Sequence, residues 1–339
     1  MATLPSRLNF MKILVITERT CSRTLKQIIA LSKKNDVHLL TKRIPSGDYC
    51  KTVTYYDGTE DKLREALRMY NFVDIVYVHN EPGWTVYSVR EILKNKRIVL
   101  DVHDAMIWRS NDEAHRSAEE RLVFSWVDGM VVPSASCKEI INTNIPCVVL
   151  PPYCNEIVYQ TRSWIRQGGI VYQGRVDLPD APEFMDYCKY ENLCKKFKES
   201  GIPFHMYMPG KDLSRHKELY NPICFFHKGL PYEQMISAMG FYDWGLCGNI
   251  PEHKEWNVAM PNKLFEYMAG GIPIIALNAK EVGDFVEANG VGISVRSIDE
   301  VKEFWDKRNE CQKNVFLKRR NFTMENNIYV VENLFNQLV

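Results

Sequence analysis

The sequence predicts an α/β protein built from two Rossmann-like domains. Short apolar runs typical of buried strands alternate with helix-like segments along nearly the whole chain, as in parallel sheets covered by helices. At 339 residues the chain is long for one hydrophobic core, so two domains are expected. A polar segment after Pro151 interrupts the alternation, which restarts at Gly169. We therefore expect one domain over residues 1–160 and a second over 161–322.

The first half contains six apolar runs, and a segment with helical spacing of apolar residues follows each of the first five. The predicted strands are Lys12–Thr17, Val37–Thr41, Asp74–His79, Arg97–Val102, Gly129–Pro133 and Cys147–Leu150. The predicted helices are Ser22–Lys34, Asp61–Tyr70, Val86–Lys94, Glu113–Trp126 and Ser136–Ile141.

The second half repeats this pattern and ends in two helices. Its predicted strands are Gly169–Gln173, Pro203–Met208, Cys224–His227, Tyr242–Cys247, Pro273–Leu277 and Gly292–Ser294. Its predicted helices are Glu183–Ser200, Tyr232–Met239, a segment beginning at Pro261, Val282–Ala288, Ile298–Glu310 and Met324–Leu338.

Composition narrows the class of protein. Hydrophobic residues make up 45% and charged residues 25% of the chain, which is typical of a globular protein. The formal charge of +1 gives no global reason to bind nucleic acid, although a local basic patch stays open. No apolar run is long enough to span a membrane. The ten cysteines include no C-x-x-C pair, which indicates free thiols in a reducing compartment and hence a cytoplasmic protein.

The first predicted helix is basic and amphipathic. It carries Arg23, Lys26, Lys33 and Lys34 around apolar residues, and such a helix can lie on an anionic membrane surface. The same apolar stripe is needed to cover the first sheet, so we favour the structural interpretation and keep peripheral membrane contact as the alternative.

The most informative segment is Pro261–Leu277, PNKLFEYMAGGIPIIAL. Pro261 suits the first turn of a helix, and the following glycine pair suits its end. Asn262 and Glu266 are four residues apart and share a polar face. The unpaired amides and positive dipole end at the start of such a helix suit a phosphate group. The segment predicts a site for a nucleoside diphosphate.

This segment resembles the donor-site helix of GT-B-fold glycosyltransferases, in particular the retaining family 4 and its relatives. Further segments resemble the family in the same order: MKILVIT at 11–17, IVLDVHD at 98–104, DGMVVPS at 128–134, VVLPPYCN at 148–155, GIVYQGR at 169–175 and GLP at 229–231. The resemblance implies two domains facing a central cleft, with a last helix, 323–339, that packs back on the first domain. It implies transfer of a sugar from a nucleotide-diphosphate sugar to a glycan, lipid-linked or other acceptor, with retention, without an obligatory metal and without a cofactor.

The resemblance also implies a donor site in the second domain. Arg175 and Lys263 would bind the diphosphate and stabilise the charge on the leaving group, which makes them candidate catalytic residues. Glu266 would accept hydrogen bonds from the ribose, and from the sequence alone we expect its carboxylate to be unpaired in the empty cleft. The full set of donor-binding candidates is Gly174, Arg175, Gly229, Leu230, Pro261, Asn262, Lys263, Leu264 and Glu266.

The acceptor would lie in the first domain, near His103, the third catalytic candidate. This histidine could orient groups near the reacting carbon, or it could simply be a strand-end residue paired with Asp104. Trp108 and Arg109 follow in a predicted loop and could line the acceptor side.

Two departures from the family pattern keep other functions open. No lysine follows Arg175 in VDLPDAP, and Val258 stands where the family has the first glutamate of E-x7-E; Glu255 could replace it only if the loop has shifted. A non-catalytic protein that binds a nucleotide sugar or a partner is one alternative. A glycosyltransferase acting on a nucleic-acid base is another.

Overall fold

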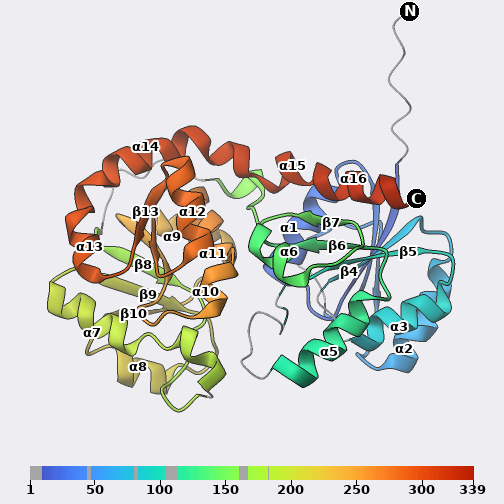
Figure 1. Cartoon of the computed structure of the whole chain (residues 1–339), viewed down its shortest axis with the longest axis horizontal. Coiled ribbons are helices and arrows are strands. Elements are labelled where there is room, and N and C mark those ends of the chain that lie inside the picture. Colours follow the sequence, from blue (N-terminus) through green and yellow to red (C-terminus); the bar gives the residue numbers. More distant parts are fainter. Residues whose placement is uncertain are drawn as a thin grey trace, which may run out of the picture.

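The computed structural model describes residues 10–43, 47–79, 83–103, 105, 113–159, 167–181 and 183–339. Two α/β domains lie side by side, and each is built around one parallel sheet (Figure 1). The predicted fold class is confirmed.

The first domain has seven parallel strands in the order β3-β2-β1-β4-β5-β6-β7. The central strands are buried along nearly their whole length, as expected for a sheet covered on both faces. The strands are β1 (Lys12–Thr17), β2 (Asp36–Thr41), β3 (Thr52–Tyr55), β4 (Ile75–His79), β5 (Arg97–Asp101), β6 (Gly129–Val132) and β7 (Cys147–Val149). The helices are α1 (Ser22–Leu31), α2 (Glu60–Leu67), η1 (Arg68–Tyr70), α3 (Gly83–Ile92), α5 (Glu113–Phe124) and α6 (Ala135–Ile141), followed by η2 (Glu156–Val158).

The second domain has six parallel strands in the order β10-β9-β8-β11-β12-β13. They are β8 (Ile170–Gln173), β9 (Phe204–Met208), β10 (Phe225–Lys228), β11 (Trp244–Gly248), β12 (Ile274–Leu277) and β13 (Gly292–Val295). The helices are η3 (Glu183–Cys188), α7 (Glu191–Ser200), α8 (Ser214–Tyr220), α9 (Tyr232–Met239), α10 (Lys254–Val258), α11 (Asn262–Gly270), α12 (Lys280–Asn289), α13 (Ile298–Glu303), η4 (Trp305–Lys307) and α14 (Arg308–Lys318).

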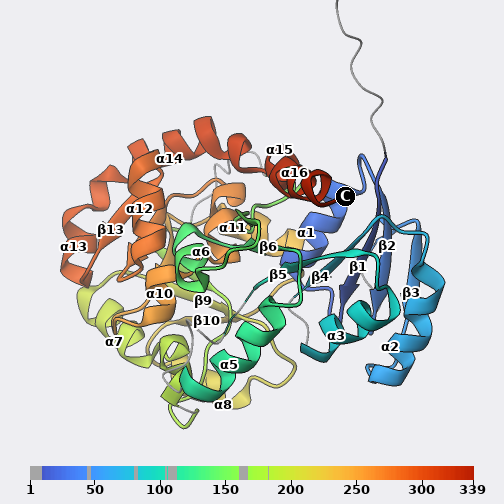
Figure 2. The same cartoon turned by 45° about the vertical axis from the view of Figure 1, so that its right-hand side comes forward.

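The end of the chain returns to the first domain through η5 (Arg319–Phe322), α15 (Met324–Asn327) and α16 (Tyr329–Leu338). Figures 1 and 2 both show this segment leaving the second domain and running over the first. Gly129 at the start of β6 lies against Leu334 and Leu338 of α16, and a β-carbon there would come within 3.0 Å of Leu338. The backbone carbonyl of Leu338 also accepts a hydrogen bond from Arg97 Nε at 3.2 Å.

Several elements differ from the sequence-based predictions. Strand β3 and helix α8 were not predicted, because neither carries a pronounced apolar run. The helix predicted over Glu183–Ser200 is divided into η3 and α7, and the one predicted over Ile298–Glu310 is divided at η4. Pro261 caps α11 in an extended conformation and does not belong to its first turn.

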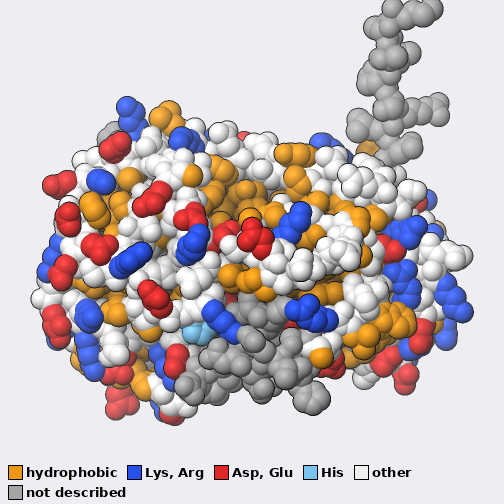
Figure 3. All heavy atoms as spheres, viewed as in Figure 1, with side chains coloured by type: hydrophobic (Ala, Val, Ile, Leu, Met, Phe, Trp, Pro, Cys, Tyr) orange, Lys and Arg blue, Asp and Glu red, His pale blue; other side chains and the backbone are white. Residues whose placement is uncertain are grey.

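Surface charge agrees with the near-zero net charge. Acidic and basic side chains are interspersed over both domains on the face shown in Figure 3. No helix among the described residues is long and apolar enough to cross a membrane.

Candidate active site between the domains

A cavity of about 770 Å³ lies between the two domains and is lined by both. In the first domain, the ends of β1 and β4 and the segment after β5 line the cavity. In the second domain, the end of β8 and the start of α11 line it. The carboxyl ends of parallel strands are the usual position of ligand crevices in such sheets. Its lining includes Cys21, Arg23, His79, His103, Gln173, Gly174, Arg175, Glu255, Trp256, Pro261, Asn262, Lys263 and Glu266.

Helix α11 points its first turn into this cavity. Pro261, Asn262 and Lys263 line it, and no side chain caps the helix. Leu264 is completely buried, so only its backbone amide is available to a ligand in the cavity. An uncapped helix start of this kind offers amide hydrogens and a positive dipole end to an anion.

Two cationic side chains flank the start of α11. Lys263 Nζ lies 4.0 Å from the ring centre of Tyr172 and 5.4 Å from that of Trp256, which fixes it by cation–π contact. The side chain of Arg175 is 58% exposed, and its Nε donates to Asp177 Oδ1 at 2.9 Å. Arg175 can therefore turn toward a ligand at the cost of one exposed ion pair.

Glu266 is paired, contrary to the expectation of an unpaired carboxylate. Its Oε1 lies 3.3 Å from Lys26 Nζ of α1, and its Oε2 accepts a hydrogen bond from Gln173. Lys26 is 2% exposed and also donates to Asn262 Oδ1 at 3.0 Å. The polar face of α11 is thus joined to the first domain by a buried lysine.

The same contacts agree with the favoured, structural interpretation of the basic helix α1. Arg23 and Lys26 are buried and paired inside the protein, and Lys33 is paired with Glu325 of α15. Two of the four basic side chains that the sequence analysis named in this region, Arg23 and Lys26, therefore point into the protein.

We predict that Glu266→Gln changes both ligand binding and stability. The amide has one acceptor oxygen where the carboxylate has two, so binding of a nucleoside diphosphate should weaken about tenfold, or ~1.4 kcal/mol. Loss of the charge beside buried Lys26 should lower the free energy of unfolding by roughly 1–3 kcal/mol. Titration calorimetry and urea unfolding measure the two effects. Glu287→Gln, on the exposed side of α12, is the matched control, and equal behaviour of the two variants would contradict the assignment.

Val258 and Glu255 lie on different sides of the short helix α10. Val258 packs into the core of the first domain, and its carbonyl oxygen accepts a hydrogen bond from Ser134 Oγ at 2.7 Å. Glu255, on the same short helix α10, is 8% exposed and lines the cavity. A carboxylate is therefore present in the cavity that α11 lines, three residues before the position that the resemblance implies.

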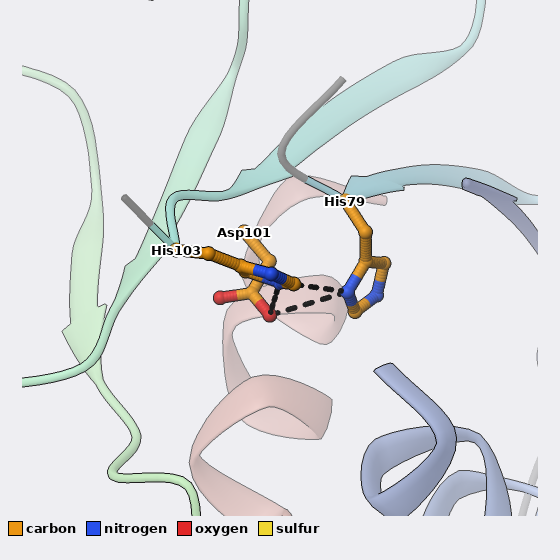
Figure 4. A group of neighbouring side chains, drawn as sticks. All are labelled: His79, Asp101 and His103. Atoms are coloured by element: carbon orange, nitrogen blue, oxygen red, sulfur yellow. Dashed lines mark hydrogen bonds and ion pairs between the residues drawn. The ribbon is translucent and has the colours of Figure 1, made fainter. Parts of the chain in front are cut away.

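His103 belongs to a buried polar network beneath the cavity. Figure 4 shows His79 and His103 both turned toward Asp101, which is completely buried. His103 Nε2 lies 3.1 Å from Asp101 Oδ2, and His79 Nδ1 lies 3.2 Å from the same oxygen. Arg23 forms a bidentate pair with Asp101, with its Nη2 2.7 Å from Oδ1 and its Nε 3.0 Å from Oδ2, and Gln27 Nε2 donates to Oδ2 at 2.6 Å.

These contacts fix the charges of the network. Burial tends to raise the pKa of Asp101, but Arg23 and His103 hold it well below its usual range. Burial tends to lower the pKa of His103, yet Asp101 and a hydrogen bond to Cys21 raise it to about 9. Burial lowers the pKa of His79 to about 4 despite its contact with Asp101. At neutral pH the network therefore contains a carboxylate, an imidazolium at His103 and a neutral His79.

The three side chains of Figure 4 also have the spacing of a metal site, since one ligand atom from each lies within 4.8 Å of the others. The positive charge of Arg23 beside Asp101 makes metal binding there unfavourable. Both oxygens of Asp101 already accept hydrogen bonds from the Arg23 guanidinium, which would repel a cation at the same position. The donor set fits a network that holds protons rather than one that binds a metal.

The structure brings together most of the residues predicted from the sequence. His103, Gly174, Arg175, Pro261, Asn262, Lys263 and Glu266 line one cavity. Gly229 and Leu230 follow β10 at the edge of the second sheet and are not among its lining residues. Asp104, Trp108 and Arg109 lie outside the described residues.

Sequence reasoning missed Cys21, Lys26 and Gln173. Cys21 had a detectable signal, since it stands directly before the predicted first helix, in the short turn after the first strand. Lys26 had none, because its partners on α11 are more than two hundred residues away in sequence.

Comparison with known proteins identifies the fold and finds a family similarity for part of the chain. Residues 183–325 match the family described as glucosyltransferase 3-like, C-terminal domain. No curated protein sequence matches the chain.

Solved structures match nearly the whole chain at low identity. Sucrose-phosphate synthase from Thermosynechococcus elongatus is 13% identical with a TM-score of 0.73, over 97% of this chain and 99% of that one. HepE from Anabaena in complex with UDP and glucose is 13% identical with a TM-score of 0.68, over 96% and 99%. An α-glucosyltransferase in complex with UDP and a 13-mer DNA is 14% identical with a TM-score of 0.59, over 97% and 100%.

These structures share the fold of the chain, and the family match covers the part of the second domain that contains α11. The chain therefore has the GT-B fold, and its residues 183–325 are similar to the glucosyltransferase 3-like C-terminal domain.

Proposed function

We propose that the protein transfers a sugar from a UDP-sugar to a hydroxyl group of a glycan or lipid-linked acceptor. The observation that carries the proposal is the uncapped start of α11, which opens into the interdomain cavity beside Lys263 and Arg175. Two cations and a helix start at one place suit a diphosphate. HepE is similar in fold and was solved with UDP and with UDP-glucose, so UDP-glucose is the first donor to test.

In this proposal the diphosphate lies at the first turn of α11, between Lys263 and Arg175. Glu266 accepts hydrogen bonds from the ribose, and the base lies toward the outer strand β10, near the backbone of Gly229 and Leu230. The two cations stabilise the charge that develops on the leaving UDP. That charge compensation does not require a metal ion, so we expect turnover to persist in a chelator, and we expect the anomeric configuration to be retained.

Glu255 is our candidate for contact with the transferred sugar. It lines the cavity and stands directly before Trp256, whose ring contacts Lys263, on α10, the helix that precedes α11. Its carboxylate can accept hydrogen bonds from sugar hydroxyls, which supports catalysis despite Val258. The acceptor would enter from the first domain, beside His103.

Binding of UDP without metal is the direct test of the donor site. At a UDP concentration about 100 times its dissociation constant, the free energy of unfolding should rise by roughly 2.7 kcal/mol in a buffer containing EDTA. Thermal unfolding with UDP, and with UMP as the control lacking the second phosphate, measures this. A melting temperature that responds to neither UDP nor any other common nucleoside diphosphate would overturn the assignment.

A non-catalytic binding protein is the second candidate, and Val258 is the observation that favours it. The side chain that replaces the family glutamate packs into the first domain and offers no polar group to a sugar. Transfer to a nucleic-acid base has less support. One similar structure contains DNA, but the net charge of +1 and the interspersed charges of Figure 3 supply little phosphate neutralisation.

A further inference from the structure

The cavity contains a thiol whose surroundings differ from those of an ordinary cysteine. Cys21 is the N-cap residue of the ten-residue helix α1, and its exposed side chain lines the cavity. Its Sγ accepts from the backbone amide of Thr24 at 3.5 Å and lies 3.2 Å from Thr24 Oγ1. His103 Nδ1 lies 3.6 Å from the same sulfur.

Cys21, His103 and Asp101 form a continuous chain of hydrogen bonds. Asp101 contacts Nε2 of His103, so the other ring nitrogen faces Cys21. Arg23 and Gln27 hold Asp101 in place from the same helix that Cys21 caps. A buried carboxylate thus orients an imidazole, which in turn contacts a thiol, the arrangement that activates a nucleophile.

The charges around Cys21 also favour its thiolate form. Partial loss of water around the sulfur at the cavity wall tends to raise the pKa of the Cys21 thiol, but the hydrogen bond and charge of His103, with the contacts to Thr24, lower it to about 6. The start of α1 adds a positive dipole end next to the sulfur. Other charged groups lining the cavity are Glu18, Arg19 and Arg23 on the side of Cys21, and Arg175, Glu255, Lys263 and Glu266 across it.

In other cysteines of the chain, the pKa of the thiol is raised instead of lowered. Burial raises the pKa of Cys50, Cys147 and Cys188 to about 11 and that of Cys137 to about 12. Cys50 and Cys147 are only partly buried, so a reagent can reach them. They are internal controls for any measurement on Cys21.

We propose that Cys21 is an activated thiol, held ready by His103 and Asp101, and that it is a site of covalent modification by peroxides and other soft electrophiles. With hydrogen peroxide, the thiolate sulfur attacks one oxygen and the O–O bond breaks. The sulfur is oxidised to a sulfenic acid, and the peroxide is reduced to hydroxide, which takes a proton from His103 to give water. With iodoacetamide, the sulfur forms a thioether and iodide leaves. Because Cys21 faces the cavity, either product occupies space on its first-domain side.

The test follows the alkylation of each cysteine with iodoacetamide by peptide mass spectrometry from pH 5 to pH 9. We expect the rate at Cys21 to reach half its maximum near pH 6 and to be flat above pH 7. The alkylation rates at Cys50 and Cys147 should still be rising with pH at pH 9. In His103→Asn the midpoint for Cys21 should move to about 8.5, the value of an ordinary thiol. A midpoint at or above pH 8 in the parent protein, or one that His103→Asn leaves unchanged, would overturn the proposal.

A second measurement covers the case in which His103→Asn does not fold. The thiolate absorbs near 240 nm, so the difference in absorbance between the parent and Cys21→Ser reports the titration of Cys21 alone. Serine keeps a side-chain oxygen for the cap of α1, and circular dichroism checks that the variant is folded. A step near pH 6 supports the proposal and a step above pH 8 contradicts it. Neither readout requires transferase activity or UDP binding, so failure here and failure of the proposed function are distinguishable.

Discussion

Asp101→Asn should destabilise the protein by about 3–5 kcal/mol, because it removes one partner of a buried ion pair. Asp101 is completely buried, and Arg23, which pairs with both of its oxygens, is 3% exposed. The variant would leave the guanidinium and the imidazolium of His103 without their counter-charge. Urea unfolding at pH 7 measures the loss.

The pH dependence of this effect has a definite sign. Because the native pKa of Asp101 is held well below its usual range, its contribution is fully present above the unfolded value of about 4 and is lost as the pH falls below it. The difference between parent and variant should therefore shrink below about pH 4. Asp180→Asn is the control, since Asp180 forms an exposed pair with Arg215. Equal loss in both variants would contradict the role assigned to the buried network.

Arg175→Ala should lower donor turnover by roughly 2–4 kcal/mol in the barrier, about 30- to 1,000-fold. In the proposed function Arg175 stabilises the charge on the departing diphosphate. Its side chain is 58% exposed and pairs only with Asp177 among the contacts described, so the free energy of unfolding should change little. Release of UDP from a UDP-sugar measures turnover, and urea unfolding measures stability.

Arg215→Ala is the matched control for Arg175. Arg215 is in the same domain, is 70% exposed and pairs with Asp180 at 2.8 Å, but it does not line the cavity. We expect turnover within about twofold of the parent for this variant. The same small effect in Arg175→Ala would show that Arg175 is a surface residue.

The parts of the molecule that could be predicted from sequence are those whose signal is local. The buried strands could be predicted from their short apolar runs. Helix α11 could be predicted because Pro261, helical spacing of apolar residues and the glycine pair occur within one short stretch, and its free amides follow from that helix start. Strand β3 and helix α8 carry little apolar signal, and their structure depends on neighbours distant in sequence.

The same distinction applies to the site. Arg175, Lys263 and Glu266 were identified because they occur at recognisable positions after a strand or on a helix. The pairing of Glu266 with Lys26, and of Asp101 with Arg23, could not be predicted, because only the packing of α1 between the sheet and α11 brings these charges together. His103 lines the cavity, but both of its ring nitrogens are engaged by Asp101, His79 and Cys21. A contact between His103 and substrate therefore requires one of these bonds to be exchanged.

Release of UDP from UDP-glucose tests the central claim most directly. The assay is run in EDTA, with and without added hydroxyl acceptors, on the parent protein and on Arg175→Ala. We predict UDP release by the parent in the chelator, faster with a suitable acceptor and reduced about 30-fold or more in the variant. Tight binding of UDP with no release from UDP-glucose or any other UDP-sugar, under all acceptors, would contradict the account and would favour a non-catalytic binding protein.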